Sequence, residues 1–288
     1  MMAMTATQPA RIHVVAVIVA TIAALVGRSW LQLKLLANGV QQDYAADLSY
    51  LAVPPILLTL LLPVLHKDRA FIGQQFRLTG LSLGTVFVAI AIGVLARAMW
   101  WSQLFAGISF GIYRNSDPSA IAGPTFTINC PAPVVVALGF LVMAIMVPII
   151  EEVTHRAYVQ TAFRHRGPIV AICLSALVFA ILHRFSGWPF AFFAGLIFGV
   201  QYWRSGTLWP SVISHATVNA LVQVDWRCVR GHWNPPPIQL PLWNIGLPSL
   251  LILAVTVLAI IYLLFGKKPG RWMRPGNDRI TERLRPSR

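Results

Sequence analysis

The chain has 288 residues, of which 57% are hydrophobic and only 11% are charged. A typical globular domain carries about 25% charged residues, and a disordered chain is poor in apolar residues. The composition therefore excludes a soluble globular protein and an intrinsically disordered one, and it predicts a protein that lies in a bilayer.

The net charge is +14, from 23 Lys and Arg against 9 Asp and Glu. The basic residues lie in short loops and in a tail over 267–288, and they are not interleaved with aromatic residues as in a nucleic-acid-binding groove. We therefore expect the lipid bilayer, and no nucleic acid, among the partners of this chain.

Eight segments are apolar enough to be membrane helices, which need roughly 20 mainly apolar residues each. They predict an all-α polytopic membrane protein that forms one integral-membrane domain over residues 1–288. The predicted spans are Ile12–Val26, Leu51–Leu65, Leu81–Trp101, Val134–Phe163, Ile169–His183, Trp188–Trp203, Leu208–Val224 and Leu247–Phe265.

The distribution of positive charge predicts the orientation. With alternating spans, one face holds 15 of the 23 Lys and Arg residues, including the tail, and the other face holds 7, with Arg156 inside a helix. Cytoplasmic loops carry the excess of Lys and Arg, so both termini are predicted to be cytoplasmic. The 7 residues of the other face are Arg28, Lys34, Arg97, Arg114, Arg184, Arg227 and Arg230.

Two long loops on the non-cytoplasmic face each hold a cysteine, Cys130 and Cys228. Disulfides persist outside the cytoplasm, so these two residues are predicted to pair, with two free thiols as the alternative. The loop over 102–131 is interpreted as a connector, although it is long enough to be a lid.

Three spans carry polar residues, which are costly in a membrane and mark a site or a pathway. They read EEVTHR at 151–156, FAILH at 179–183 and HATVN at 215–219. Glu152 and Arg156 are four residues apart and share a helix face, as do His215 and Asn219. Alone, each cluster has a structural explanation, such as a helix cap or a neutralised buried ion pair. Together they favour one shared site within the helical bundle.

The predicted depths agree with a shared site. Glu151 and His183 each lie 16 residues from the turn centred on Gly167. At 1.5 Å per residue, both are about 24 Å from that turn, and His215 is about 15 Å from the turn at 204–206 on the same face. We expect the three side chains to meet in the half of the bilayer away from the basic loops.

The three motifs, in this order, resemble the CAAX proteases and bacteriocin-processing enzymes, also called the abortive-infection family, with its patterns EExxxR, FxxxH and HxxxN. The resemblance covers about 134–224, a family-like catalytic core, and SGTLWP at 205–210 is also similar. His155 departs from the pattern, because many relatives have an aromatic residue there. It is expected either to alter the basicity of Glu151 or to face the loop.

The resemblance implies a glutamate-type intramembrane endopeptidase similar to the type II CAAX prenyl endopeptidases. It implies that Glu151 is the general base and that His183 helps to hold and polarise the water. His215 and Asn219 are then expected to stabilise the oxyanion, with Glu152 and Arg156 as a supporting ion pair. Peptide hydrolysis needs such a base and such donors.

Other chemistries stay open at this point. Ser175 and Cys173 are weak candidates for a nucleophile, since neither lies in a motif. Zinc is a competitor, because His183, His215 and one glutamate offer three ligands. The chain lacks the HExxH motif of helix-borne zinc proteases, so we expect no metal and no cofactor.

The implied reaction is cleavage near the C-terminus of a membrane-anchored or prenylated (CAAX-type) protein, so the substrate is a protein or a lipidated peptide. The charge count places the site toward the non-cytoplasmic face, where prenylated tails are absent. Processing or sorting of exported proteins in a bacterial inner (plasma) membrane is therefore an alternative, and a non-catalytic immunity or regulatory partner is another. A transporter is disfavoured, because the sequence shows no repeat symmetry.

Overall fold

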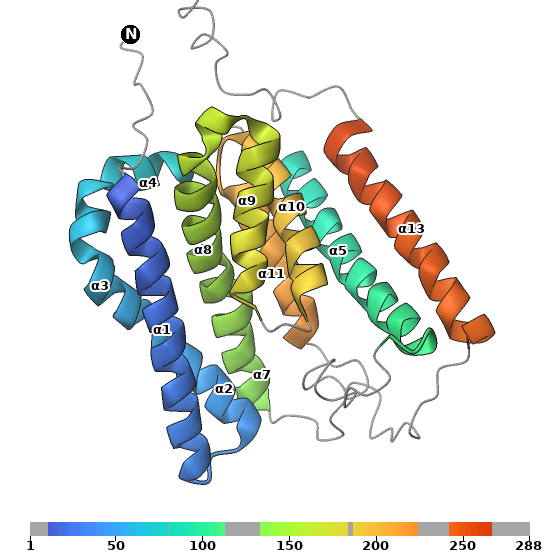
Figure 1. Ribbon diagram of the computed structural model, residues 1–288, viewed down its shortest axis with the longest axis horizontal. Coiled ribbons are helices and arrows are strands. Elements are labelled where there is room, and N and C mark those ends of the chain that lie inside the picture. Colours follow the sequence, from blue (N-terminus) through green and yellow to red (C-terminus); the bar gives the residue numbers. More distant parts are fainter. Residues whose placement is uncertain (1–10, 80, 113–132, 184–186, 224–241, 267–288) are drawn as a thin grey trace, which may run out of the picture.

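The computed structural model describes residues 11–79, 81–112, 133–183, 187–223 and 242–266 (Figure 1). These residues form helices, turns and short connections, which confirms the predicted all-α class. The helices, including π-helical and 3₁₀ segments marked η, are α1 (Arg11–Ala37), α2 (Gln42–Tyr50), α3 (Val53–Lys67), α4 (Arg69–Gln75), α5 (Leu83–Ser109), α7 (Pro133–Gly139), η2 (Phe140–Met146), α8 (Val147–Glu152), η3 (Val153–Gln160), η4 (Arg164–Arg166), α9 (Pro168–Ile181), α10 (Trp188–Ser205), α11 (Trp209–Gln223), η6 (Leu242–Gly246), α13 (Leu247–Ile261) and η7 (Tyr262–Gly266).

Five helical stretches in the described part of the chain are long and apolar enough to cross a membrane, which confirms a polytopic membrane protein. They correspond to the first four predicted spans and to the last. The helices α9, α10 and α11 have 14, 18 and 15 residues, so the count of eight spans stays a prediction. The five stretches are Ile12–Ala37, Tyr44–Lys67, Leu83–Ser109, Val136–Gln160 and Trp243–Gly266.

The predicted C-terminal ends of the first and third spans are wrong. In both, the helix continues through polar residues beyond the point where the apolar run stops. The first helix runs to Ala37 and therefore contains Arg28 and Lys34, which the charge count had placed in a loop. The third runs to Ser109, so the segment 102–109 is helix rather than loop. Arg97 lies inside this helix, as in the predicted span Leu81–Trp101, and not in a loop, although the charge count had assigned it to the non-cytoplasmic face. The rest of that loop, Cys130, Cys228 and the basic tail lie outside the described residues, and the single-domain organisation stays a prediction.

The fourth predicted span is one continuous helix, built from α7, η2, α8 and η3 in succession. At the boundaries, Gly139, Val147 and Val153 all keep right-handed helical backbone angles. All residues from Thr154 to Gln160 in η3 are buried, as expected for a helix enclosed on every side. The helices α1, α9, α10 and α11 therefore pack against this continuous helix.

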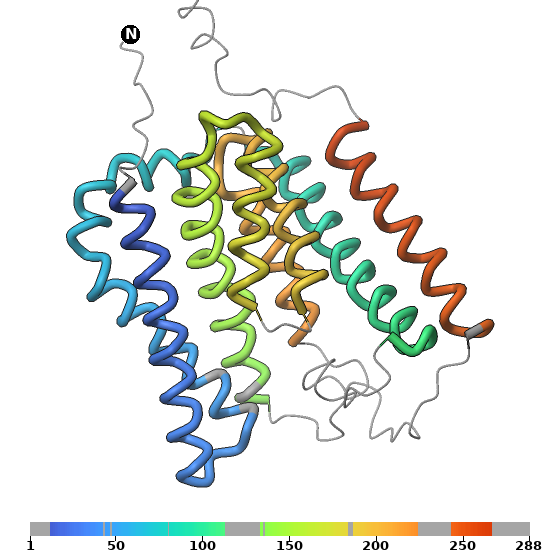
Figure 2. The backbone as a smooth tube through the Cα atoms, in the orientation of Figure 1, coloured from blue at the N-terminus to red at the C-terminus, as the bar shows by residue number. Residues whose placement is uncertain are grey.

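The other helices surround this element in a layered arrangement (Figure 1; Figure 2). On one side, α1 packs against α3, and η3 contacts α1. The hairpin of α9 and α10, together with α11, occupies the middle of the bundle, and α5 and α13 lie side by side at the opposite edge. The motif at 151–156 thus lies on α8 and η3, and the other two lie at the end of α9, which packs on η3, and on α11, which packs on α8.

Two glycines close the turns of this layer. Gly167 (φ 89°) separates η4 from α9, and Gly206 (φ 67°) ends α10 in the left-handed conformation. Residues with a side chain rarely adopt such angles, so glycine is suited to both turns. The turns fall where the sequence placed them, and they direct α9 back along η3 and α11 back along α8 and η2.

Close helix contacts rely on glycine as well. A methyl group added at Gly93 of α5 would lie 2.6 Å from the carbonyl oxygen of Ser214 and 2.6 Å from Cβ of Thr217, both on α11. A methyl group at Gly195 of α10 would lie 2.9 Å from Cα of Ala176 on α9. Small residues of this kind let helix backbones approach closely in a membrane.

Candidate active site

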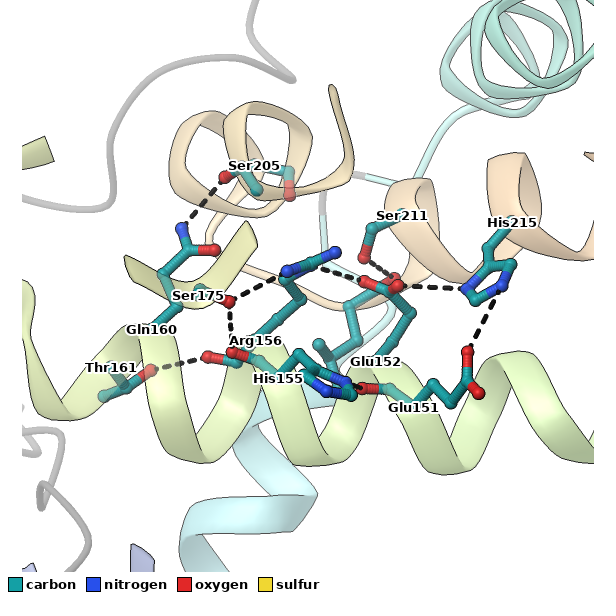
Figure 3. A network of polar contacts seen from close by, with 12 residues as sticks. Glu151, Glu152, His155, Arg156, Gln160, Thr161, Ser175, Ser205, Ser211 and His215 are labelled. Carbon is teal, nitrogen blue, oxygen red and sulfur yellow. Dashed lines mark hydrogen bonds and ion pairs between the residues drawn. The ribbon is translucent and has the colours of Figure 1, made fainter. Parts of the chain in front are cut away.

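The centre of the polar network is a fully buried ion pair between Glu152 and Arg156. The distance from Arg156 Nε to Glu152 Oε2 is 3.0 Å, and both side chains are 0% exposed. Arg156 Nη1 also donates to the hydroxyl of Ser175 on α9, at 2.8 Å, and that hydroxyl donates to the carbonyl of His155, at 2.7 Å (Figure 3). The pair thereby joins η3 to α9.

The imidazole of His215 on α11 lies between the two adjacent carboxylates (Figure 3). Its Nδ1 is 3.1 Å from Glu152 Oε1, and its Nε2 is 3.5 Å from Glu151 Oε2. Glu152 is paired with Arg156 as a carboxylate, which can only accept hydrogen bonds. The Nδ1 atom of His215 therefore carries the proton of this bond, and Nε2 is directed to Glu151.

The two glutamates differ in their access to solvent or substrate. The side chain of Glu151 is 24% exposed, whereas that of Glu152 is 0% exposed and has both oxygens occupied, one by Arg156 and one by His215. Of the two, only Glu151 has a free edge that a water molecule or a substrate can reach.

Two phenylalanine rings pack around His215 and Arg156. The ring of Phe198 on α10 stacks on the imidazole of His215, with centroids 4.9 Å apart and planes at 18°. The ring of Phe179 on α9 meets the same imidazole edge-on at 5.7 Å and lies 5.3 Å from the guanidinium carbon of Arg156. These rings fix the imidazole plane and keep water away from the buried ion pair.

His183 lies beyond the end of α9, which ends at Ile181, and its side chain is exposed rather than inside a span. Its Nδ1 lies 2.7 Å from the carbonyl of Phe179, and its ring lies 4.6 Å from the Phe179 ring. Phe179 thus contacts both motif histidines. Among the described residues, no direct contact joins the side chains of His183 and Glu151.

Asn219 lies one turn beyond His215 on α11 and is partly exposed. Its side-chain amide donates to the carbonyl of Met143 in η2, at 2.8 Å. One of the two amide hydrogens is thereby used to hold the side chain, which leaves the second as a donor.

His155 is only 2% exposed, so the expectation that it faces the loop is wrong. Its Nδ1 lies 2.7 Å from the carbonyl oxygen of Glu151, and its ring meets Phe179 edge-on at 5.0 Å. Its Nε2 atom is buried and has no hydrogen-bond partner within the described part of the chain. His155 therefore contacts the backbone of the candidate base rather than its carboxylate.

The structure argues against both alternative nucleophiles. Cys173 is exposed and free on α9, and within the described residues it takes no part in the polar network around His215. Ser175 is 0% exposed, and both its donor and its acceptor capacity are used by His155 and Arg156. The sequence placed Ser175 near the motifs but did not reveal it as the partner of Arg156, because nothing in its spacing indicates which helix face meets η3.

No three His, Cys, Asp or Glu side chains lie close enough together to hold a metal ion in the ranges that the structure covers. The two nitrogens of His215 are directed to different carboxylates, which is not a shared ligand set. The roles of the six motif residues and the absence of a metal stay predictions.

Comparison with known proteins supports the resemblance seen in the motifs. No curated protein and no solved structure matches the chain. Residues 133–221 match the family model described as "Type II CAAX prenyl endopeptidase Rce1-like". That stretch holds all three motifs and the helices that bring Glu151, Glu152, Arg156 and His215 together. The match confirms the resemblance: over residues 133–221, this integral membrane chain is similar to the type II CAAX prenyl endopeptidase Rce1-like family.

Proposed function

We propose that this protein is an intramembrane endopeptidase in which Glu151 acts as the general base. The observation that carries the proposal is the unequal pair of adjacent glutamates: Glu152 is buried and fully paired, whereas Glu151 is partly exposed and faces His215. A base must reach a water molecule, and the paired neighbour holds the imidazole in place. The family match over this region supports a membrane protease.

In the proposed reaction, Glu151 removes a proton from water while the oxygen attacks the carbonyl carbon of the peptide bond. His183, at the exposed end of α9, helps to hold and polarise that water. The second amide hydrogen of Asn219 and a proton on Nε2 of His215 stabilise the oxyanion. The amide nitrogen then leaves with the proton that Glu151 took up. The proposed scheme uses no metal and no cofactor.

Glu152 and Arg156 act in this scheme through His215. The carboxylate of Glu152 accepts the Nδ1 proton at 3.1 Å, which fixes the imidazole with Nε2 on the side of Glu151. In the proposal, the reacting carbonyl binds on that side. For His215 to donate from Nε2 as well, it must carry a proton on both nitrogens, and the adjacent Glu152 carboxylate balances that charge.

The proposed substrate is a membrane-anchored or prenylated (CAAX-type) protein, cut near its C-terminus. Processing or sorting of exported proteins is a second candidate, favoured by the position of the site. The basic turns at Arg164–Arg166 and at Arg204 lie at one end of the bundle, whereas His183 lies at the other end of α9. By the positive-inside rule, the site then opens away from the cytoplasm.

The test compares membrane proteomes from cells that carry the wild type, Glu151→Gln or Asp68→Asn. Glu151→Gln keeps the size of the side chain but removes the base, so C-terminal fragments of the substrates should disappear and intact precursors should accumulate. Asp68→Asn is the matched control, because Asp68 pairs with His13 and is not part of the network around His215. A Glu151→Gln variant with full biological effect would instead support the non-catalytic immunity or regulatory role.

A further inference from the structure

Arg97 places a cation in the middle of a membrane-spanning helix. It is the fifteenth of the 27 residues of α5, so it lies about 20 Å from either end of the helix. The hydrocarbon core is about 30 Å thick, which puts a mid-helix residue well below the headgroups. An ionisable residue at this depth is costly and marks a functional site with a partner.

The partner of Arg97 is missing from the described part of the chain. The residue is 6% exposed, and its Nε atom is buried without a hydrogen-bond partner. The carboxylates whose side chains are described, Asp68, Glu151 and Glu152, pair with other residues. The guanidinium carbon instead lies 4.1 Å from the ring centre of Trp100 and 4.8 Å from that of Trp101. Contact with ring faces holds the cation while its N–H groups stay available for a planar acceptor.

Arg97 lies near the candidate active site, along the helix face that packs on α11. On that face, the carbonyl of Ala89 accepts from Ser214 at 2.7 Å, and Gly93 touches Ser214 and Thr217. Residue numbers increase together along the two helices, from Ala89 beside Ser214 to Gly93 beside Ser214 and Thr217, so α5 and α11 run in the same direction. Arg97 follows Gly93 by one turn, about 6 Å further toward the end of α11 that carries Asn219.

A second contact links Arg97 to the site through α10. Trp100 meets Phe190 at 6.1 Å, and two turns further along α10 the ring of Phe198 stacks on His215. The guanidinium is therefore offset from His215 along the bundle, toward the end at which His183 is exposed.

From this geometry, and on the basis of the function proposed above, we propose that Arg97 binds the C-terminal carboxylate of the peptide substrate. A carboxylate two to four residues beyond the cleaved bond lies about 7–14 Å from that bond in an extended chain. This range agrees with the position of Arg97, which lies about one helical turn beyond the contact of Gly93 with α11 and carries a long side chain. A lipid phosphate stays at the headgroup level, whereas a carboxylate on a bound peptide is carried to this depth.

The test measures kcat/KM for two matched probes, an S-farnesylated CAAX-type peptide with a free C-terminal acid and the same peptide as the C-terminal amide. The full chain is reconstituted in phosphatidylcholine vesicles. A charge-assisted hydrogen bond predicts that the wild type prefers the acid by roughly 10- to 100-fold. Arg97→Gln should lose this preference by slowing cleavage of the acid alone, and Arg97→Lys should restore part of it.

The matched control is Arg28→Gln, because Arg28 also stacks on an aromatic ring, that of Tyr50 at 3.9 Å, but on α1. Its acid-to-amide ratio should equal that of the wild type. The proposal is overturned by a wild type that cleaves both probes equally, or by an Arg97→Gln variant that loses both in proportion. It is also overturned if the effect of Arg97→Gln appears only with phosphatidylglycerol in the vesicles, which would identify a headgroup ligand.

A binding measurement separates this proposal from the proposed function. In the Glu151→Gln background, which lacks the base, the acid should bind more tightly than the amide, and Arg97→Gln should abolish the difference. If the wild type cleaves neither probe but this binding difference is seen, the endopeptidase proposal fails and the carboxylate site stands. If the acid and the amide bind equally, the proposal that Arg97 binds a carboxylate fails, whether or not the protein cleaves peptides.

Discussion

Arg156 neutralises a carboxylate that has no access to water, so its replacement should be severe. Arg156→Leu removes the arginine partner of the buried Glu152 carboxylate and leaves it only the contact with His215, so we expect a loss of about 3–5 kcal/mol of stability. Arg166→Leu, at an exposed position in η4, is the control and should unfold as the wild type does. The measurement is thermal unfolding of the purified proteins in detergent.

A double variant separates charge from shape. Glu152→Gln with Arg156→Leu removes both charges, so it should regain part of the lost stability while staying inactive, because the amide holds His215 less firmly. Equal unfolding temperatures for Arg156→Leu and Arg166→Leu would show that Glu152 is not charged in the folded protein.

Ser175 offers a second prediction at this scale. Ser175→Ala leaves a buried guanidinium N–H of Arg156 and the carbonyl of His155 without this partner, at a cost of about 1–3 kcal/mol. Peptide cleavage should persist, because the residue holds Arg156 and does not attack the substrate. Ser29→Ala, at an exposed hydroxyl on α1, should change neither property. A folded but fully inactive Ser175→Ala protein would reinstate the serine as a nucleophile.

At the scale of the elements, the contact between α5 and α11 depends on Gly93. The added methyl group of Gly93→Ala would collide with the backbone of Ser214, next to His215, and we expect a loss of about 1–3 kcal/mol and reduced activity as α5 moves away. Gly73→Ala in α4 is the control, since open space surrounds that position and alanine favours a helix. The measurements are the unfolding temperature and the cleavage rate of both variants. Equal values for Gly93→Ala and Gly73→Ala would show that the contact between α5 and α11 does not depend on Gly93.

The sequence predicted the existence of these elements better than their ends. Apolar runs indicate which residues face lipid, but α5 continues past Trp101 to Ser109. The hydroxyl of Ser102 donates to the carbonyl of Ala98 at 2.8 Å, so this polar residue is accommodated within the helix. The π-helical turns of η2 and η3 left no mark in the sequence. The turns at Gly167 and Gly206 were predictable, because few other residues adopt their angles.

The candidate site was predictable to a similar degree. Spacing of four residues identified the pair of Glu152 and Arg156, and the helix depths predicted that Glu151, His183 and His215 meet. The structure places Glu151 and His215 3.5 Å apart, but among the described residues the side chain of His183, which was predicted at the same depth as Glu151, does not contact it. The ring of Phe179 between His183 and His215 was not predictable, since the sequence does not reveal how α9 is rotated about its axis.

At the scale of the whole molecule, the orientation in the membrane follows from where the basic turns lie. We expect Arg166→Cys to react with a membrane-impermeant maleimide from the cytoplasmic side only, because Lys and Arg concentrate in cytoplasmic loops. Ile112→Cys, at a position that is 74% exposed just beyond α5, should react from the opposite side only. Both are made in a background in which Cys130, Cys173 and Cys228 are replaced by serine.

Permeabilised cells, in which both positions must react, provide the control for this labelling. The opposite pattern would place the exposed His183 at the cytoplasmic face, and a prenylated cytoplasmic tail would then become the favoured substrate over an exported protein.

The unbroken burial of η3, from Thr154 to Gln160, has a consequence for how this chain tolerates sequence change. A helix on the rim of a bundle alternates permissive and restrictive positions with each turn, but this one has no outward side. Saturation mutagenesis should therefore find a continuous band of seven intolerant positions here, whereas α13 should tolerate exchanges among aliphatic residues along its exposed stripe.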